Sequence, residues 1–269
     1  MTAPRLIIAS TGLLVLLVFA FGGPLWYRVD PAAVDLAQTI APRSPTHPLG
    51  TDESGRDVLA RLMVGGRVTL VVGVSAGLVA LLLGTALGGL AASRRPAIEA
   101  LVGRLLDAAM AVPSFFILLV VVTLFGGSTV TLVVAIGATA WIGIARLVRA
   151  ESLSLRERDY VTVAQALGGS PGRVFVKHLV PHLAPTLSAA AGIGVSQAVL
   201  TESALSYLGL GVQPPQPSWG NMLTGAQPNL LAAPWLALYP GVLIVLTVLA
   251  CHAVAEQFRS PEFSRAQRT

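Results

Sequence analysis

Long stretches without a charged residue constrain this 269-residue chain more than any other feature. Charged side chains are absent from residues 68–92, 108–145, 183–201 and 230–251. A helix that crosses a bilayer needs about 20 mostly apolar residues, which is close to the length of the shorter runs. Only 12% of all side chains are charged, whereas a soluble domain usually has about 25%. The runs therefore predict membrane spans.

The pattern predicts six transmembrane helices in an all-α integral membrane protein. The run 108–145 is too long for one span and contains the turn signal FGGST near its middle. With the N-terminal apolar run, the predicted helices cover residues 6–26, 68–92, 105–125, 129–147, 184–206 and 235–257. Pro113 predicts a kink in the third helix. The first run also has features of a cleaved signal peptide, but its length favours a retained helix.

The distribution of basic residues predicts the orientation. Five of the 18 Lys and Arg residues fall between the first two spans, and the others cluster on the opposite side. The positive-inside rule then places both termini in the cytoplasm. The excess of basic over acidic residues indicates the membrane topology and contact with anionic lipid, and it does not indicate binding to nucleic acid.

The predicted organisation has three parts. Residues 1–67 contain the first helix, an external segment and an amphipathic helix. This last helix is expected to lie on the membrane, because four apolar residues recur on one face: Val58, Leu59, Leu62 and Met63. A flexible tether is the alternative for this segment. Residues 68–257 form the membrane core with a cytoplasmic loop at 150–180, and residues 258–269 form a cytoplasmic tail.

The loop between the fourth and fifth helices resembles a piece of a soluble protein. Gly168 and Gly169 predict the end of a short helix that begins near residue 155 or 160. On this helix Tyr160, Val163, Ala164 and Leu167 share one apolar face. Such a face packs on the chain's own helices or lipid, or it inserts into a groove on a partner. The pattern alone leaves both readings open.

Four segments cover most of residues 49–223. They are GTDESGRDVLARLMVGGRVTL, RLLDAAMAVPSF, RERDYVTVAQALGGSPGRVFVKHLVPH and ESALSYLGLGVQPPQPSWGNML. These segments resemble, in the same order, the ABC importer permeases of the dipeptide, oligopeptide and nickel family, in particular the dipeptide permease C subunit. Thr162 stands where the family's loop is usually acidic, so an ion pair to a partner from that position is not carried over.

The resemblance implies a type I ABC importer permease architecture, in which a cytoplasmic coupling helix contacts the ATPases. It implies a non-catalytic subunit of a prokaryotic plasma membrane that forms half of a translocation path for small peptides. The implied partners are a second homologous permease, two ATPase subunits or domains that bind ATP and Mg, and an external substrate-binding protein. No cofactor or metal is expected on this chain. Nickel or another small ligand is the alternative cargo.

The same resemblance gives the loop 155–180 the role of coupling to the ATPases. Its expected docking residues are Tyr160, Val163, Ala164, Leu167 and Gly168, with Gly168 supplying the turn.

Polar side chains inside the predicted spans are candidates for a translocation path or gate. Glu202 is the first of them, because a carboxylate at the centre of a membrane helix costs about 3 kcal/mol. Glu202 lies near the external end of the fifth helix, so structural hydrogen bonding remains the competing role. Ser196 and Gln197 either line the path or bond neighbouring helices.

Two other function classes are compatible with a membrane protein of this length. A stand-alone secondary transporter or channel would work without ATPases, usually with an internal repeat, and none is visible. An intramembrane enzyme would need a catalytic motif such as HExxH, and the sequence has no such motif.

Overall fold

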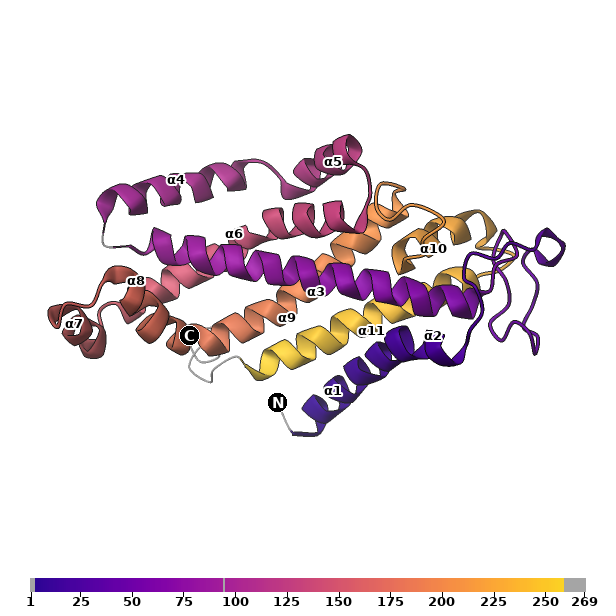
Figure 1. The fold of residues 1–269 in the computed structure, drawn as a ribbon, viewed down its shortest axis with the longest axis horizontal. Coiled ribbons are helices and arrows are strands. Elements are labelled where there is room, and N and C mark those ends of the chain that lie inside the picture. The colour runs from indigo at the N-terminus through magenta and orange to yellow at the C-terminus, as the bar shows by residue number, and fades with distance from the viewer. Residues whose placement is uncertain (1–2, 94, 259–269) are drawn as a thin grey trace.

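The computed structural model describes residues 3–93 and 95–258, with side chains from residue 7 onward except that of Gln165. Within these ranges the fold consists of long helices packed side by side (Figure 1). The only β pairing in the described ranges is one isolated bridge between Thr51 and Asp57. The prediction of an all-α membrane protein is confirmed.

The first three helical segments form one continuous N-terminal rod. Its parts are α1 (Ala3–Leu17), a π-helical segment η1 (Val18–Gly22) and α2 (Gly23–Trp26). The central helices are α3 (Val58–Ala91), α4 (Pro96–Ala111), α5 (Ser114–Phe125) and α6 (Thr129–Leu155). The remaining α-helices are α7 (Asp159–Ala166), α8 (Pro171–Val174), α9 (Val180–Tyr207), α10 (Trp219–Ala226) and α11 (Trp235–Gln257). The π-helical η3 (Phe175–Leu179) joins α8 to α9, and short 3-10 turns occupy η2 (Leu36–Gln38) and η4 (Gln227–Asn229).

Five helical units in the described ranges are long and apolar enough to cross a membrane, and α4 with α5 would make a sixth. The axes of α4 and α5 differ by 80° at the break between them. The prediction of one third helix at 105–125 is therefore wrong, because α4 begins at Pro96 and the helix breaks before Ser114. Pro113 lies in this break, and its missing N–H cannot continue the helical hydrogen bonding. The kink expected at Pro113 is confirmed and is larger than a simple bend.

Helix α3 lies in the middle of the bundle, where it packs most extensively on α6 and next on α9. Glycines of α3 allow its backbone to approach α9 and α6 closely. A Cβ added at Gly73 would lie 2.4 Å from Val199 Cγ2, and one added at Gly88 would lie 2.5 Å from the carbonyl oxygen of Ala145. Small residues at helix contacts are the usual means of tight packing in membranes. On the other side α11 packs on α9 and α1.

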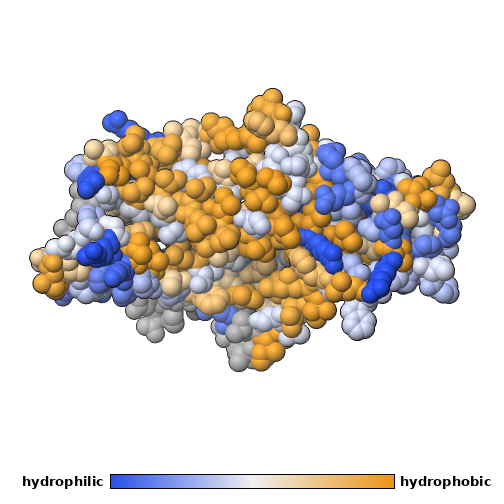
Figure 2. Space-filling view, viewed as in Figure 1, coloured by the Kyte–Doolittle hydropathy of each residue, from blue (hydrophilic) through white to orange (hydrophobic). Residues whose placement is uncertain are grey.

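The bundle has two polar ends separated by an apolar middle. Figure 2 shows hydrophobic surface over the central part and hydrophilic patches toward both ends. One end carries residues 27–57 and α10, and we refer to it as the loop end. The opposite end carries α7 and α8, and we refer to it as the α7 end. The first turn of α1 and the last turn of α11 are both directed toward the α7 end (Figure 1).

The amphipathic helix expected before the second span is not a separate element. Its residues form the first turns of α3, which is capped by Asp57 through a hydrogen bond from the Ala60 N–H to Oδ1 at 2.8 Å. Val58 and Leu62 are only 1% and 2% exposed, and they pack in one cluster with Trp219 of α10. These side chains are therefore buried within the bundle, and they cannot contact lipid at the membrane surface. The predicted tail 258–269 lies, apart from Phe258, outside the described residues.

Candidate functional sites

The short helix predicted in the loop between spans is α7, which ends close to the expected residue. Gly168 follows it with φ +86°, a left-handed conformation that favours glycine. The turn is closed by hydrogen bonds from the Leu167 N–H to the Val163 oxygen at 3.0 Å and from the Gly169 N–H to the Ala164 oxygen at 3.1 Å. An added Cβ at Gly168 would meet no atom within 4 Å. The backbone angle, and not a steric clash, therefore requires glycine here.

Three of the four predicted docking side chains on α7 and the turn after it are exposed. Tyr160, Val163 and Leu167 are 36%, 56% and 83% exposed, and together we call them the α7 patch. Ala164 differs, because it is half-buried against the same cluster as the fully buried Val161. Residues three apart share a helix face, so Val161 and Ala164 form the inner face of α7. Ala164 therefore packs partly on the chain's own helices, which is one of the two readings that the sequence pattern leaves open, and its docking role stays a prediction.

A stacked pair of rings joins α7 to the first turn of α9. The rings of Tyr160 and His182 have centroids 4.8 Å apart and planes inclined by 19°. A hydrogen bond orients the imidazole ring of His182, since its Nδ1 lies 2.7 Å from the backbone oxygen of His178. The α7 patch is thus attached to a helix that runs through the whole bundle.

Glu202 is fully buried near the loop end of α9, where hydroxyl groups surround its carboxylate. Ser206 Oγ donates to Oε1 at 2.7 Å, and Ser203 Oγ lies 3.4 Å from Oε2. Ser206 Oγ also accepts a hydrogen bond from the Val212 N–H at 3.0 Å. The carboxylate is therefore part of a network that fixes the turn after α9, as buried polar groups generally require.

The three candidate path residues do not gather in one place. Ser196 is fully buried, and its hydroxyl donates to the Gly192 oxygen of its own helix at 2.9 Å. Gln197 lies exposed on the outer surface of α9. These positions favour hydrogen bonding within the bundle for Ser196 and Glu202, and they leave only Gln197 accessible from outside the chain.

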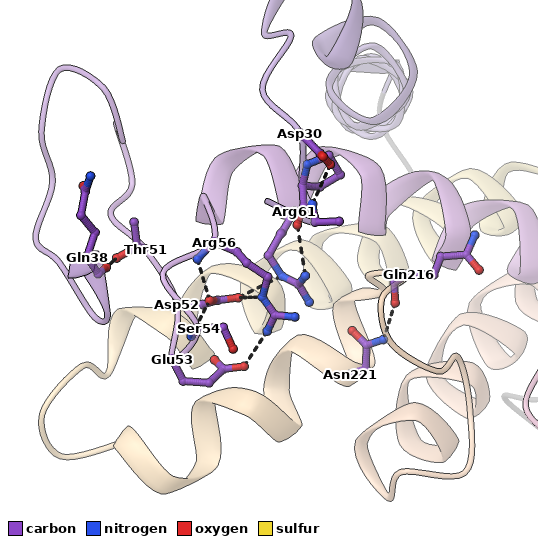
Figure 3. Close-up of polar contacts among 12 residues, drawn as sticks. Asp30, Gln38, Thr51, Asp52, Glu53, Ser54, Arg56, Arg61, Gln216 and Asn221 are labelled. Atoms are coloured by element: carbon purple, nitrogen blue, oxygen red, sulfur yellow. Dashed lines mark hydrogen bonds and ion pairs between the residues drawn. The ribbon is translucent and has the colours of Figure 1, made fainter. Parts of the chain in front are cut away.

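The loop end contains a charged network that the sequence analysis did not single out. Asp52 Oδ2 lies 2.8 Å from Arg56 Nε and 3.2 Å from Arg61 Nε. Glu53 Oε1 lies 2.7 Å from Arg56 Nη2. Asp52 Oδ1 accepts the backbone N–H groups of Ser54 and Arg56 (Figure 3). Asp52, Glu53, Arg56 and Arg61 form what we call the Asp52 network, whose sequence signal is the alternation of charge in TDESGRDVLAR.

The Asp52 network borders a pocket of about 340 Å³. Its wall includes the start of α3, the segment 206–214, α10 and the first turn of α11. The two innermost charged side chains, Asp52 and Arg61, are only 6% and 5% exposed. Both charges are paired, which buried charges generally require. The pocket wall therefore contains charged groups that are held in place by ion pairs.

A second polar contact ties the loop to the start of α3. Asp57 Oδ2 accepts the Tyr27 hydroxyl at 2.8 Å and lies 2.8 Å from His47 Nδ1. Burial raises the pKa of the Tyr27 hydroxyl to about 12, and the hydrogen bond to Asp57 and the charge of Asp57 add to this effect. Among the described residues no group of three or more His, Cys, Asp or Glu is placed to hold a metal ion.

Comparison with known proteins identifies the class. Residues 84–259 match the family described as binding-protein-dependent transport system inner membrane component. Over 94% of its length the chain is 32% identical to the oligopeptide transport system permease protein OppC of Bacillus subtilis (strain 168), and it covers 84% of that protein. It is 37% identical to a putative peptide permease protein of Brucella suis biovar 1 (strain 1330), over 91% of this chain and 82% of the relative. It is also 33% identical to the dipeptide transport system permease protein DppC of B. subtilis, over 93% of this chain and 79% of the relative.

The chain belongs to this family of inner-membrane transport components. It is a multi-pass membrane protein and a permease subunit of an ABC importer.

Proposed function

We propose that this chain forms half of a translocation path for short peptides across a prokaryotic plasma membrane. The peptide cargo is supported by the names of the relatives, which include oligopeptide and dipeptide permease proteins. The remaining parts of the proposed importer are a second homologous permease, two ATPases and an external substrate-binding protein. In this importer ATP and Mg bind to the ATPases, since the sequence of this chain contains no GxxxxGK[ST] motif.

The observation that carries the proposal is the α7 patch. Its three apolar side chains are exposed on a helix at the polar end of the bundle, away from the apolar middle that faces lipid. An apolar helix face in water is stabilised when it inserts into a groove on a partner protein. We assign this groove to an ATPase, so that the α7 patch is where ATP-driven movement enters the permease.

The orientation is part of the proposal. The α7 end faces the cytoplasm together with both termini, and the loop end faces outward. Support comes from the basic residues, which are denser on the side of α7. In this orientation the Asp52 network and its pocket lie where an external binding protein would deliver cargo.

The contacts of α7 give a physical route for coupling. A displacement of α7 would be passed to α9 through the Tyr160–His182 stack. Val161 would add to this, because it belongs to a buried cluster that also includes residues of α6 and α9. Helix α9 packs on α3, α6, α10 and α11, so its movement would reach the centre of the bundle.

Copurification tests the proposed assembly. The tagged chain is purified from its native membranes in mild detergent, and the accompanying proteins are identified by mass spectrometry. The expected result is one similar permease and one or two ATPases. Recovery of a homo-oligomer without an ATPase would contradict the proposal and favour a stand-alone transporter or channel.

A further inference from the structure

The pocket at the loop end has hydrogen-bond donors that the protein itself does not use. Arg56 binds Asp52 through Nε and Glu53 through Nη2, and Arg61 binds Asp52 through Nε and the Pro31 oxygen through Nη1 at 3.3 Å. Within the described part of the chain, Arg56 Nη1 and Arg61 Nη2 have no hydrogen-bond partner. Both arginines line the pocket, and Arg61 is held there although it is 95% buried. Two positively charged donor groups are thus available to a ligand.

The same pocket has unused acceptors. Glu53 bonds Arg56 through Oε1, while its Oε2 has no partner in the described ranges. The carboxylate lies against the backbone of α10, where a Cβ added at Gly225 would be 3.0 Å from Oε2. Gln213 donates through Nε2 to the oxygens of Gly209 at 2.9 Å and Gly211 at 3.0 Å, so its own amide oxygen remains to accept a hydrogen bond. Donors and acceptors therefore border one cavity.

Charge balance selects the class of ligand. Two carboxylates and two guanidinium groups give the Asp52 network no net charge, so a simple anion or cation would add an uncompensated charge to a largely buried site. A ligand that carries one charge of each sign avoids this cost. The volume of about 340 Å³ is within the usual range of small-molecule sites, roughly 300–1,000 Å³. Val58, Met222 and Leu236 in the wall provide apolar contact for a side chain.

We propose that this pocket binds a short zwitterionic peptide, with the terminal carboxylate on Arg56 and Arg61 and the terminal amine on Glu53. The inference rests on the proposed peptide cargo and adds a receiving site on this chain. The site adjoins one candidate path residue, because Ser206 in the pocket wall donates a hydrogen bond to Glu202. It would hold the peptide at the outer mouth before it enters the path.

Blocked peptides test each terminus separately. The complex is purified in detergent without the binding protein, and the binding of L-alanyl-L-alanine is measured by calorimetry. Its N-acetyl and C-amide derivatives are then compared with it. We expect saturable binding of the free dipeptide and about tenfold weaker binding when either terminus is blocked.

Two variants test which residue of the pocket binds each terminus of the dipeptide. Glu53→Gln is expected to weaken binding of the free dipeptide about tenfold and to leave binding of its N-acetyl derivative unchanged. Arg56→Gln is expected to weaken binding of the free dipeptide and to leave that of the C-amide unchanged. The matched control is Glu99→Gln at the α7 end, because Glu99 is also 36% exposed and ion-paired, at 3.7 Å from Arg149. A purely structural role for the network would instead weaken binding of all three peptides equally.

The outcomes separate this inference from the proposed function. Absence of saturable dipeptide binding, or an equal loss for free and blocked peptides in the variants, would overturn the receiving site. The importer proposal would stand in that case if ATPases still copurify and uptake is retained. Dipeptide binding by a chain that purifies without ATPases would support the site and contradict the importer assembly.

Discussion

Tyr160 and His182 are stacked at 4.8 Å between ring centroids, so the exposed helix α7 is directly attached to the first turn of α9. Helix α9 has 28 residues, which corresponds to about 42 Å at 1.5 Å per residue. It carries Glu202 near its far end, beside α10. One helix therefore connects the proposed ATPase contact to the proposed outer mouth.

Replacing His182 tests whether the stack transmits movement. His182→Ala should lower the number of peptides imported per ATP hydrolysed several-fold, with only a small change in unfolding temperature, since such a ring pair contributes about 0.5–1.5 kcal/mol. His182→Phe should restore the ratio because it restores a ring. His178→Ala is the control, because His182 contacts only the backbone oxygen of that residue. An unchanged ratio in His182→Ala would argue against this route.

The turn after α7 should be sensitive to the identity of residue 168. A β-branched side chain at φ +86° is strained by about 1–2 kcal/mol, so Gly168→Val should distort the turn that positions the α7 patch. We expect normal membrane insertion together with ATP hydrolysis that is no longer coupled to uptake. Gly172→Val serves as the control, because that glycine also has free space around its Cβ but no positive φ. Unimpaired uptake by Gly168→Val would refute the role of the turn.

Glu202 should act mainly through its hydrogen bonds. Glu202→Gln retains the shape and an acceptor oxygen, and we expect unchanged uptake kinetics. Glu202→Ala removes the acceptor of the Ser206 hydroxyl and should cost about 1–3 kcal/mol. The unfolding temperature of the purified protein would fall by several degrees. A Glu202→Gln protein with a normal unfolding temperature but lost uptake would instead place the carboxylate in the path.

The contact between Tyr27 and Asp57 should stabilise the protein in a pH-dependent manner. The folded protein raises the Tyr27 pKa from 10.0 to about 12, so the contribution is complete below pH 10 and is lost as the pH rises toward 12. Below pH 10, Tyr27→Phe should lower stability by about 0.5–1.5 kcal/mol, the usual value of one hydrogen bond. Thermal unfolding of both proteins from pH 8 to 12 measures the difference. A gap that stays constant or widens with pH would contradict this assignment.

Much of the helical framework could be predicted from hydropathy, because charge-free runs have one stable form in a bilayer. The short helix α7 was also predictable, since Gly168 and Gly169 mark its end. The packing of the first turns of α3 could not be predicted in this way. Val58 and Leu62 have the spacing of a helix that lies on the membrane, and the sequence does not reveal that Trp219, far along the chain, covers them. Partners that are distant in sequence decided that outcome.

The site was predicted less completely than the fold. Ala164 falls at the edge of the apolar face, and only the packing of Val161 shows that it turns inward. The burial of Asp52 and Arg61 could not be predicted either, because it depends on α10 and α11, which close the pocket around them. A close alternation of Asp, Glu and Arg was the visible signal, but it is equally typical of a solvated loop.

The most direct test of the central claim is a crosslink from Leu167 to an ATPase. The single cysteine of the chain, Cys251, is buried, so Leu167→Cys would introduce one accessible thiol at the tip of the α7 patch. Leu231→Cys is the control, since Leu231 is fully exposed between α10 and α11 at the loop end. With a short thiol-to-amine reagent in native membranes, the account predicts an ATPase adduct from position 167 and none from position 231. No adduct from position 167 in membranes that still import peptide, or an ATPase adduct from position 231, would contradict it.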